Sequence, residues 1–496
     1  MAPSTTLIDP IPSPPSKRQK IFSVTGVNIE ADILSISDEK GFEDTATISS
    51  HPLRIKPSGN AYTSESNLRD TSTGLFAVFP DELIIDILGY LDAESLSQLG
   101  FTSRGLYAFS RHEELWKALF IESPKSKLPF TWRGIWRRTH LSLPFSKEVL
   151  IPTPDLFSDT LHRPFHMSQI PLKPYASKIP SQNAILCLPD MTAEDFNQKY
   201  STAPFILTSP VKDWAGYKEW SIASLVDRYR DVRFRAESVD WRLGDYYDYM
   251  RDQTDESPLY LFDRAFVEKT GGELGRGFTV PECFGKDYFE VLGDERPDRR
   301  WMILGPERSG STFHKDPNAT SAWNAVIEGE KYWIMFPPGS PPPGVYESED
   351  HSEVTSPLSI AEWLVGFHRE ARRTKGCREG ICKAGEILYV PSGWWHLVVN
   401  LSPSLALTQN FIPPTQLSAA IEFLRDQPGS VSGFNTKRVR DPYGLFIKRM
   451  EEQYPVELQA ALEKLEKKKK TKWGTLTDTK GQGFSFGFGC EDSDEE

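Results

Sequence analysis

The second half of the chain holds a series of short apolar runs that are separated by glycine, proline and polar residues. Short strands that follow one another closely, with turn residues between them, are typical of an antiparallel β-sandwich or barrel. The sequence therefore predicts a β-rich domain, in which the strands cover residues 260–262, 301–304, 322–327, 332–336, 387–390, 395–401 and 406–411.

The connections within this predicted domain, which spans 183–415, differ in length. Glu328-Gly329 lies between two apolar runs and predicts a hairpin turn. Residues 337–383 interrupt the strand series, so they are predicted to form a surface insertion. Helical spacing returns in 416–472, where C-terminal helices are expected, and 473–496 end in an acidic, low-complexity stretch that predicts disorder.

The first part of the chain has a different composition. Residues 1–74 are rich in Ser, Thr, Pro and Asp and predict a disordered leader. Residues 79–120, within a module of 75–122, carry apolar side chains at helical spacing and predict four short helices. Such a module has little room for its own core, which favours docking on a partner. Residues 123–182 are predicted to be a connector that packs on the next domain.

Two basic segments and one histidine pair allow more than one interpretation. The run 17–20 (Lys-Arg-Gln-Lys) fits either a nuclear-import signal or a solvated basic stretch. The run 467–470 (Lys-Lys-Lys-Lys) fits a solvated helix end, a nucleic-acid contact, an import signal or, if lysine is the substrate, a target of self-modification. His162 and His166 are four residues apart, but Pro164 between them argues against a helix that carries both.

Composition excludes several classes of protein. The formal net charge is −12, which argues against a protein that coats nucleic acid with its whole surface. The five cysteines are scattered, which favours a reducing compartment over a disulfide framework. No run of about 18 apolar residues occurs, so no membrane span is predicted.

Three residues supply the chemistry of a metal site. His314 and Asp316 are two residues apart on a segment predicted to be extended, so both side chains project from the same face. His396 follows a turn and begins a later predicted strand. Two histidines and one carboxylate form the facial triad that binds non-haem Fe(II) and leaves positions open for a chelating cosubstrate and dioxygen. His314, Asp316 and His396 are therefore the predicted metal ligands and catalytic centre.

The N-terminal helical module resembles an F-box. The resemblance rests on Phe79-Pro80-Asp81-Glu82-Leu83, Ile87-Leu88-Gly89-Tyr90-Leu91, Arg104 and Leu115-Trp116-Lys117. The chain departs from the usual pattern at Phe79, where Leu is common, and at Thr102-Ser103, where Val-Cys is common. The resemblance implies that 79–120 dock on a Skp1-like adaptor of a cullin ubiquitin ligase.

The residues around the triad resemble the Jumonji C (JmjC) family of Fe(II)/2-oxoglutarate oxygenases, and more narrowly its bifunctional arginine demethylase and lysyl-hydroxylase subgroup. The resemblance covers roughly 180–415. It rests on the segments 257–263, 320–325, 329–333, 385–386, 390–396 and 407–411. It implies a mixed fold, in which an all-helical F-box precedes a double-stranded β-helix (cupin or jelly roll) with flanking helices.

The same resemblance implies roles for further residues and cofactors. Lys331 would bind the distal carboxylate of 2-oxoglutarate, Asn324 and Thr408 would hydrogen-bond the same cosubstrate, and Tyr260 would line the pocket. Ser311 stands where the subgroup has a threonine near the substrate, a small departure that affects substrate fit. The implied cofactors are Fe(II), 2-oxoglutarate and O₂, with ascorbate as reductant.

Three functional hypotheses follow from these patterns. The first is a nuclear oxygenase that hydroxylates a protein side chain, by lysyl hydroxylation or by N-methyl demethylation, on a histone or an RNA-associated protein, coupled to a ubiquitin ligase through the F-box. The second is a non-catalytic F-box receptor whose cupin domain only recognises substrates. The third is a JmjC hydroxylase that modifies RNA, against which the acidic net charge weighs mildly.

Overall fold

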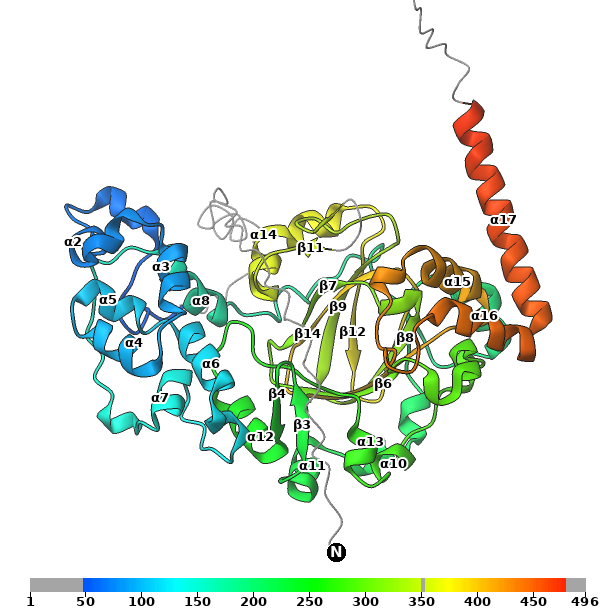
Figure 1. The fold of residues 1–496 in the computed structure, drawn as a ribbon, viewed down its shortest axis with the longest axis horizontal. Coiled ribbons are helices and arrows are strands. Elements are labelled where there is room, and N and C mark those ends of the chain that lie inside the picture. Colours follow the sequence, from blue (N-terminus) through cyan, green and yellow to red (C-terminus); the bar gives the residue numbers. More distant parts are fainter. Residues whose placement is uncertain (1–47, 349–352, 479–496) are drawn as a thin grey trace, which may run out of the picture. The chain divides into compact units, whose positions relative to one another are not determined.

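The computed structural model describes residues 48–348 and 353–478, with side chains described as far as residue 470. Its β-domain consists of a nine-stranded and a four-stranded sheet, which we call the large and the small sheet (Figure 1). The large sheet has the order β1 (Leu186–Leu188), β2 (Phe205–Leu207), β13 (Ile387–Val390), β8 (Ser321–Glu328), β15 (Ser404–Phe411), β6 (Arg300–Gly305), β5 (Leu261–Asp263), β3 (Arg233–Ala236) and β4 (Val239–Arg242). The small sheet has the order β12 (Arg378–Lys383), β9 (Glu330–Phe336), β14 (Trp395–Asn400) and β7 (Gly310–His314).

Four pairs of successive strands cross from one sheet to the other. The pairs β6 and β7, β8 and β9, β12 and β13, and β14 and β15 are each joined by a short connection, at residues 306–309, 329, 384–386 and 401–403. Backbone hydrogen bonds join these connections, such as Leu401 N to Glu330 O at 2.9 Å, so they lie together at what we call the closed end of the barrel. This arrangement is the double-stranded β-helix that the family resemblance predicts.

The hairpin predicted at Glu328-Gly329 is wrong. β8 pairs with β13 and β15, whereas β9 pairs with β12 and β14, so the turn crosses from one sheet to the other. Gly329 has a φ of 87°, a left-handed conformation that glycine adopts without strain and that suits a tight turn of either kind. The sequence signal is therefore the same for a hairpin and for a crossing between sheets.

The predicted insertion 337–383 is correct only for its first part. It contains the two-stranded sheet of β10 (Tyr346–Glu347) and β11 (Val354–Thr355) and the helix α14 (Ile360–Arg373), but its last six residues form β12, an integral strand of the small sheet. β12 includes Arg378, Glu379 and Lys383, and these charges hid it in the sequence. α14 covers the outer face of the small sheet, where Trp363 packs on Phe313 with ring centroids 4.8 Å apart.

The four helices predicted for the F-box module are confirmed as α3 (Asp81–Leu88), α4 (Ala93–Gly100), α5 (Arg104–Phe109) and α6 (Glu113–Glu122). The Asp92 carboxylate caps α4 by accepting from the Ser95 backbone N–H at 2.7 Å. These helices share one hydrophobic core with the helical face of the large sheet, through α7 (Trp136–Leu141), whose Trp136 is buried against Trp241.

Two expectations for the N-terminal half need correction. Residues 48–74 are not a disordered leader: Leu53 and Ile55 are buried, and Leu53 O accepts from Thr153 N at 2.7 Å. The apolar partners of this segment lie far away in sequence, so its local composition did not reveal it. Residues 1–47, with the basic run 17–20, lie outside the described residues.

The second correction concerns the histidine pair. His162 and His166 both belong to one helix, α8 (Asp159–Gln169), and their rings stack with centroids 5.6 Å apart. Pro164 removes one backbone donor from this helix. Because Leu161 and Met167 are buried on its inner face, packing offsets that loss.

Three helices follow the β-domain: α15 (Leu417–Asp426), α16 (Pro442–Gln453) and α17 (Pro455–Asp478). Their apolar faces, including Phe446, Met450 and Leu465, form a separate core cluster. The expected acidic tail begins inside α17, and 479–496 lie outside the described residues. Among the described helices, none has the length and apolar character that crossing a membrane would need.

Candidate metal and cosubstrate site

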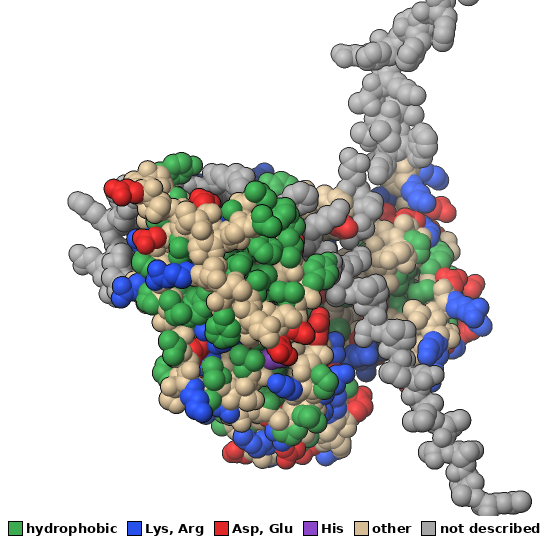
Figure 2. Space-filling view, turned by 60° about the vertical axis from the view of Figure 1, so that its left-hand side comes forward, with side chains coloured by type: hydrophobic (Ala, Val, Ile, Leu, Met, Phe, Trp, Pro, Cys, Tyr) green, Lys and Arg blue, Asp and Glu red, His purple; other side chains and the backbone are tan. Residues whose placement is uncertain are grey.

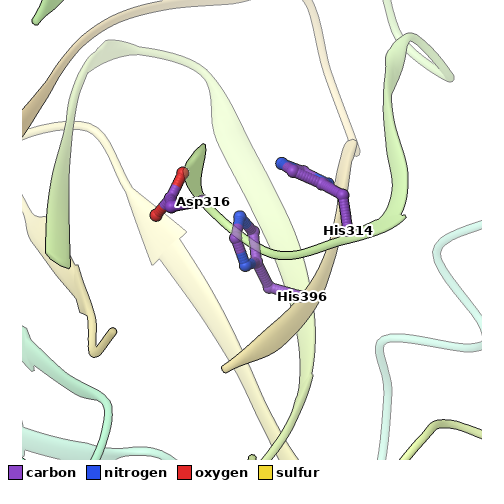
Figure 3. Close-up of side chains that lie close together, drawn as sticks. All are labelled: His314, Asp316 and His396. Carbon is purple, nitrogen blue, oxygen red and sulfur yellow. The ribbon is translucent and has the colours of Figure 1, made fainter. Parts of the chain in front are cut away.

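The structure brings the three predicted metal ligands together at the end of the barrel opposite the connections, which we call the open end. His314 ends β7, His396 lies directly opposite it on β14, and Asp316 follows two residues after His314. The two imidazole rings have centroids 4.1 Å apart, and one ligand atom from each of the three residues lies within 4.8 Å of the others (Figure 3).

A β-bulge sets the direction of the side chains on β7. His396 pairs with His314, but Val398 pairs with Ser311, so three steps on β7 correspond to two steps on β14. The extra residue lets both Ser311 and His314 share the face of their partners, which is the interior of the barrel. Ser311, the predicted substrate contact, is half-buried on this face.

The backbone around the two histidines selects the tautomer that a metal requires. Nδ1 of His314 lies 2.7 Å from Thr312 O, and Nδ1 of His396 lies 3.1 Å from Trp394 O. A carbonyl oxygen only accepts, so each Nδ1 carries the hydrogen and each Nε2 keeps its lone pair. Such second contacts orient and fix metal-binding imidazoles.

The electrostatics of the cluster also fit a cation. Oδ2 of Asp316 is buried and, among the described residues, has no hydrogen-bond partner. Burial raises the pKa of Asp316 above its ordinary value, and burial, followed by the charge of His314, holds the pKa of His396 well below its ordinary value. A divalent ion bound to this carboxylate and to two neutral imidazoles would offset the free-energy cost of burying the charged carboxylate and would suit the uncharged form of His396. Within the described residues this is the one group with metal-binding geometry, and its donor set suits Fe(II).

The predicted cosubstrate lysine lies at the closed end of the same cavity. Lys331 is completely buried on β9, and its Nζ donates to the Tyr260 hydroxyl at 2.6 Å and to Asn400 Oδ1 at 2.8 Å. Burial lowers the pKa of Lys331 to about 7. Among the described residues no carboxylate forms an ion pair with this ammonium group, so a carboxylate of a bound ligand is its natural partner.

Asn324 and Thr408 lie between these two ends. They face each other in register on β8 and β15, with Asn324 four residues before the end of β8. Oδ1 of Asn324 is buried without a hydrogen-bond partner among the described residues, and the Thr408 hydroxyl donates to Trp323 O at 2.8 Å. The geometry therefore places polar groups along a path from Lys331 to the metal ligands, as 2-oxoglutarate would require.

Two asparagines at the site were missed in the sequence. Asn400 Oδ1 accepts from Lys331 Nζ, and Asn410 donates to Thr320 Oγ1 at 2.9 Å. Asn410 also counteracts the rise that burial causes in the pKa of Asp316. Asn410 lies within the motif 407–411, where its alternation with Thr408 was a usable signal. Asn400 follows an apolar strand, and nothing in the sequence marks it.

A double-stranded β-helix that carries two histidines and one carboxylate at its open end, with a buried lysine at its closed end, defines an iron- and 2-oxoglutarate-dependent oxygenase. Comparison with known families agrees: residues 242–416 match the cupin-like domain, and 76–122 match the F-box-like family. The chain belongs to the JmjC family of iron- and 2-oxoglutarate-dependent oxygenases, in its F-box-containing form.

Curated relatives support this assignment. The chain is 37% identical over 467 residues to the arginine-specific demethylase JMJ22 of Arabidopsis thaliana, which covers 90% of this chain and 91% of that protein. It is 33% identical over 240 residues to the bifunctional arginine demethylase and lysyl-hydroxylase psr-1 of Caenorhabditis elegans. That alignment covers 45% of this chain and 59% of psr-1. It is 32% identical over 160 residues to the 2-oxoglutarate and iron-dependent oxygenase JMJD4 of Danio rerio. That alignment covers 31% of this chain and 36% of JMJD4.

Proposed function

We propose that this oxygenase removes methyl groups from methylated arginine side chains of proteins. The observation that carries the proposal is the likeness to a protein named an arginine-specific demethylase, because it extends over nine-tenths of both chains and includes both domains. Lysyl hydroxylation is the second candidate, since psr-1 is named for both activities. A non-catalytic receptor is not favoured, because all three metal ligands and Lys331 are present in binding geometry.

The chemistry follows from the cofactor that the site fits. Bound Fe(II) supplies oxidation by O₂: 2-oxoglutarate loses CO₂ and becomes succinate with one oxygen atom, while the other oxygen atom enters a substrate C–H bond as hydroxyl. On an N-methyl group the resulting hydroxymethyl releases formaldehyde and leaves N–H, whereas on a lysine side-chain carbon the hydroxyl remains. The chain itself binds one end of 2-oxoglutarate with Lys331 and orients the ligand imidazoles through Thr312 O and Trp394 O.

The test uses the purified full chain with Fe(II), 2-oxoglutarate and air, with ascorbate as the proposed reductant. Peptides that carry a methylated arginine should lose a methyl group and release formaldehyde in proportion to succinate. Lysine peptides that instead gain the mass of one oxygen atom would replace demethylation by lysyl hydroxylation as the activity. Peptides that stay unchanged while 2-oxoglutarate is consumed would remove both candidates.

We also propose that the F-box docks on a Skp1-type adaptor. Large apolar side chains are exposed on this module, with Leu75 90%, Tyr90 78% and Phe101 84% exposed. Figure 2 shows hydrophobic side chains gathered over the F-box side of the molecule. The module is fixed to the β-domain, because the Asp255 carboxylate accepts from Trp136 Nε1 at 2.8 Å and lies 3.7 Å from Lys117 Nζ. An adaptor bound here would hold the oxygenase site in one orientation.

Finally, we propose a nuclear location and histones among the substrates. The support for the nuclear location is the basic run 17–20, which fits an import signal. Replacing its three basic residues by alanine in a fluorescently tagged chain should move the fluorescence from the nucleus to the cytoplasm. An unchanged distribution would remove this support.

A further inference from the structure

The inner face of the large sheet carries two aromatic side chains that the site described above does not use. Trp301 on β6 lies directly opposite Thr408 of β15, and Phe262 on β5 lies directly opposite Ile303 of β6. Opposed residues of an antiparallel pair project from the same face, so both aromatic rings share the face of Thr408. Their ring centroids are 5.4 Å apart with the planes tilted by 35°.

Only one of these two rings, that of Trp301, lies at the level of the metal ligands. β6 and β7 run in opposite directions on either side of the connection 306–309. Trp301 lies five residues before this connection and His314 lies five residues after it, so the two residues face each other across the barrel. Facing sheets are about 10 Å apart, a gap that inward side chains span. Trp301 therefore flanks the metal ligands at the open end, and Phe262, which lies opposite Ile303, is two residues nearer the closed end.

The pair also has a free surface. The small sheet ends at β7, which faces β6, so no strand of the small sheet covers β5. Phe262 is 39% exposed as a consequence, although its neighbours Leu261 and Asp263 are buried on the opposite face. Trp301 is half-buried beside it.

The cations of the protein near this pair are engaged elsewhere. Arg264 forms an ion pair with Asp298, and Arg300 donates to Gln409 Oε1 at 2.6 Å while its guanidinium lies over Phe278. In the described part of the chain, no lysine or arginine lies over the ring of Phe262 or Trp301. The electron-rich faces of both rings are thus left for a cation from another molecule.

We propose that Phe262 and Trp301 bind the cationic side chain of the substrate, a guanidinium or ammonium group, by cation–π contact and hold it beside His314. The proposal rests on the proposed function, which supplies arginine or lysine as substrate. The two ligands would then meet opposite charges: buried Lys331 receives the anionic cosubstrate at the closed end, and the aromatic pair receives the cationic side chain nearer the metal ligands. N-methyl groups would add apolar contact with the same rings.

The test compares two short, otherwise identical neutral peptides, one centred on dimethylarginine and one on citrulline, the uncharged isostere of arginine. Binding to the full chain is measured by fluorescence anisotropy with Mn(II) and 2-oxoglutarate under nitrogen, so that no turnover occurs. The wild-type chain should bind the dimethylarginine peptide about 3- to 30-fold more tightly, which is the range of one or two cation–π contacts.

Phe262→Leu keeps an apolar side chain but removes the ring, and should abolish this preference, whereas Phe262→Tyr should keep it. Trp301→Leu should behave like Phe262→Leu. Trp301 is partly buried, so its substitution can prevent folding; in that case the comparison of Phe262→Leu with Phe262→Tyr decides the question. Phe145→Leu, at an 80% exposed aromatic residue outside the β-domain, is the matched control and should bind both peptides as wild type does.

Each outcome decides one proposal. A preference that survives Phe262→Leu overturns the aromatic pair as the cation site, and equal binding of both peptides by the wild-type chain overturns it as well. Absence of demethylation and hydroxylation in the earlier peptide assay, with the charge preference intact, overturns the proposed function and leaves the cation site standing.

Discussion

Lys331 and Asn400 lie directly opposite each other on β9 and β14, and the lysine ammonium donates to the asparagine amide oxygen at 2.8 Å. The amide nitrogen of Asn400 donates in turn to Ser309 Oγ at 3.0 Å, in the connection between β6 and β7. A single buried amide therefore fixes the predicted 2-oxoglutarate lysine to the closed end of the barrel. This relationship has a kinetic consequence.

Substitution of Asn400 should weaken cosubstrate binding more than it slows turnover. Asn400→Ala leaves Lys331 with one fewer partner, and we expect KM for 2-oxoglutarate to rise about tenfold, the effect of one buried hydrogen bond, with a smaller change in kcat. Asn400→Asp should raise KM further, because the new carboxylate competes for the ammonium group. Succinate formation at varied 2-oxoglutarate measures both variants. Loss of kcat with unchanged KM would contradict a positioning role.

The pKa of Lys331 predicts how 2-oxoglutarate binding depends on pH. Burial lowers this pKa to about 7 in the free protein, and a bound carboxylate would raise it. Below pH 7 the lysine is already charged, so affinity should be constant. Above pH 7 binding must take up a proton, and affinity should fall by up to about tenfold per pH unit.

Calorimetric titration of the Mn(II)-loaded chain with 2-oxoglutarate, under nitrogen, measures this dependence. The matched control is Lys331→Arg, because a guanidinium stays protonated throughout this range. Its affinity should be weaker but free of the decline above pH 7. The same decline in both proteins would assign the effect to another group.

Glu379 should stabilise the fold in a pH-dependent way. Burial alone would raise its pKa. His368, whose Nε2 lies 3.7 Å away, the hydroxyl that Tyr332 donates and the charge of Arg372, whose Nε donates at 2.9 Å, together hold the pKa at about 2. A depressed carboxyl pKa contributes stability above the unfolded value, near 4.5, and loses it as the pH falls towards 2. Glu379→Gln should therefore cost about 3 kcal/mol near neutral pH, the usual cost of breaking a buried pair.

Thermal unfolding at several pH values checks this expectation. The Tm of Glu379→Gln should lie below that of the wild-type chain by a constant margin above pH 5, and the two values should converge as the pH falls from 4.5 towards 2. A margin that does not depend on pH would show that packing, and not ionisation, is responsible.

The exposed apolar surface of the F-box should determine adaptor binding. Phe101 is 84% exposed at the end of α4, and Phe101→Ser should reduce capture of a purified Skp1-type adaptor about tenfold or more, as loss of a central aromatic contact does. Tyr346→Ser, at a 68% exposed residue of β10 in the β-domain, is the control and should bind like the wild-type chain. Equal capture by both variants would place the adaptor elsewhere.

The sequence predicted the parts of the molecule whose signals are local. The F-box helices, seven strands and the triad all follow from spacing or short motifs, and the structure shows His314, Asp316 and His396 together. β12 was not predicted, because it contains charged residues such as Glu379. The hydrogen-bond and ion-pair partners of these residues come from distant segments of the chain. Contacts between segments far apart in the sequence also explain the packing of 48–74 and the hydrogen bond from Lys331 to Asn400. No local sequence pattern indicates such contacts.

The central claim is that His314, Asp316 and His396 bind Fe(II) for oxidation coupled to 2-oxoglutarate, and succinate formation tests it most directly. The purified full chain with Fe(II), ascorbate, air and 2-oxoglutarate should form succinate above the rate of a matched Asp316→Ala sample, even before a substrate is known. Succinate formation that is equal in the two proteins, together with equal 2-oxoglutarate binding to both metal-loaded forms, would contradict the assignment of these residues as the oxygenase centre.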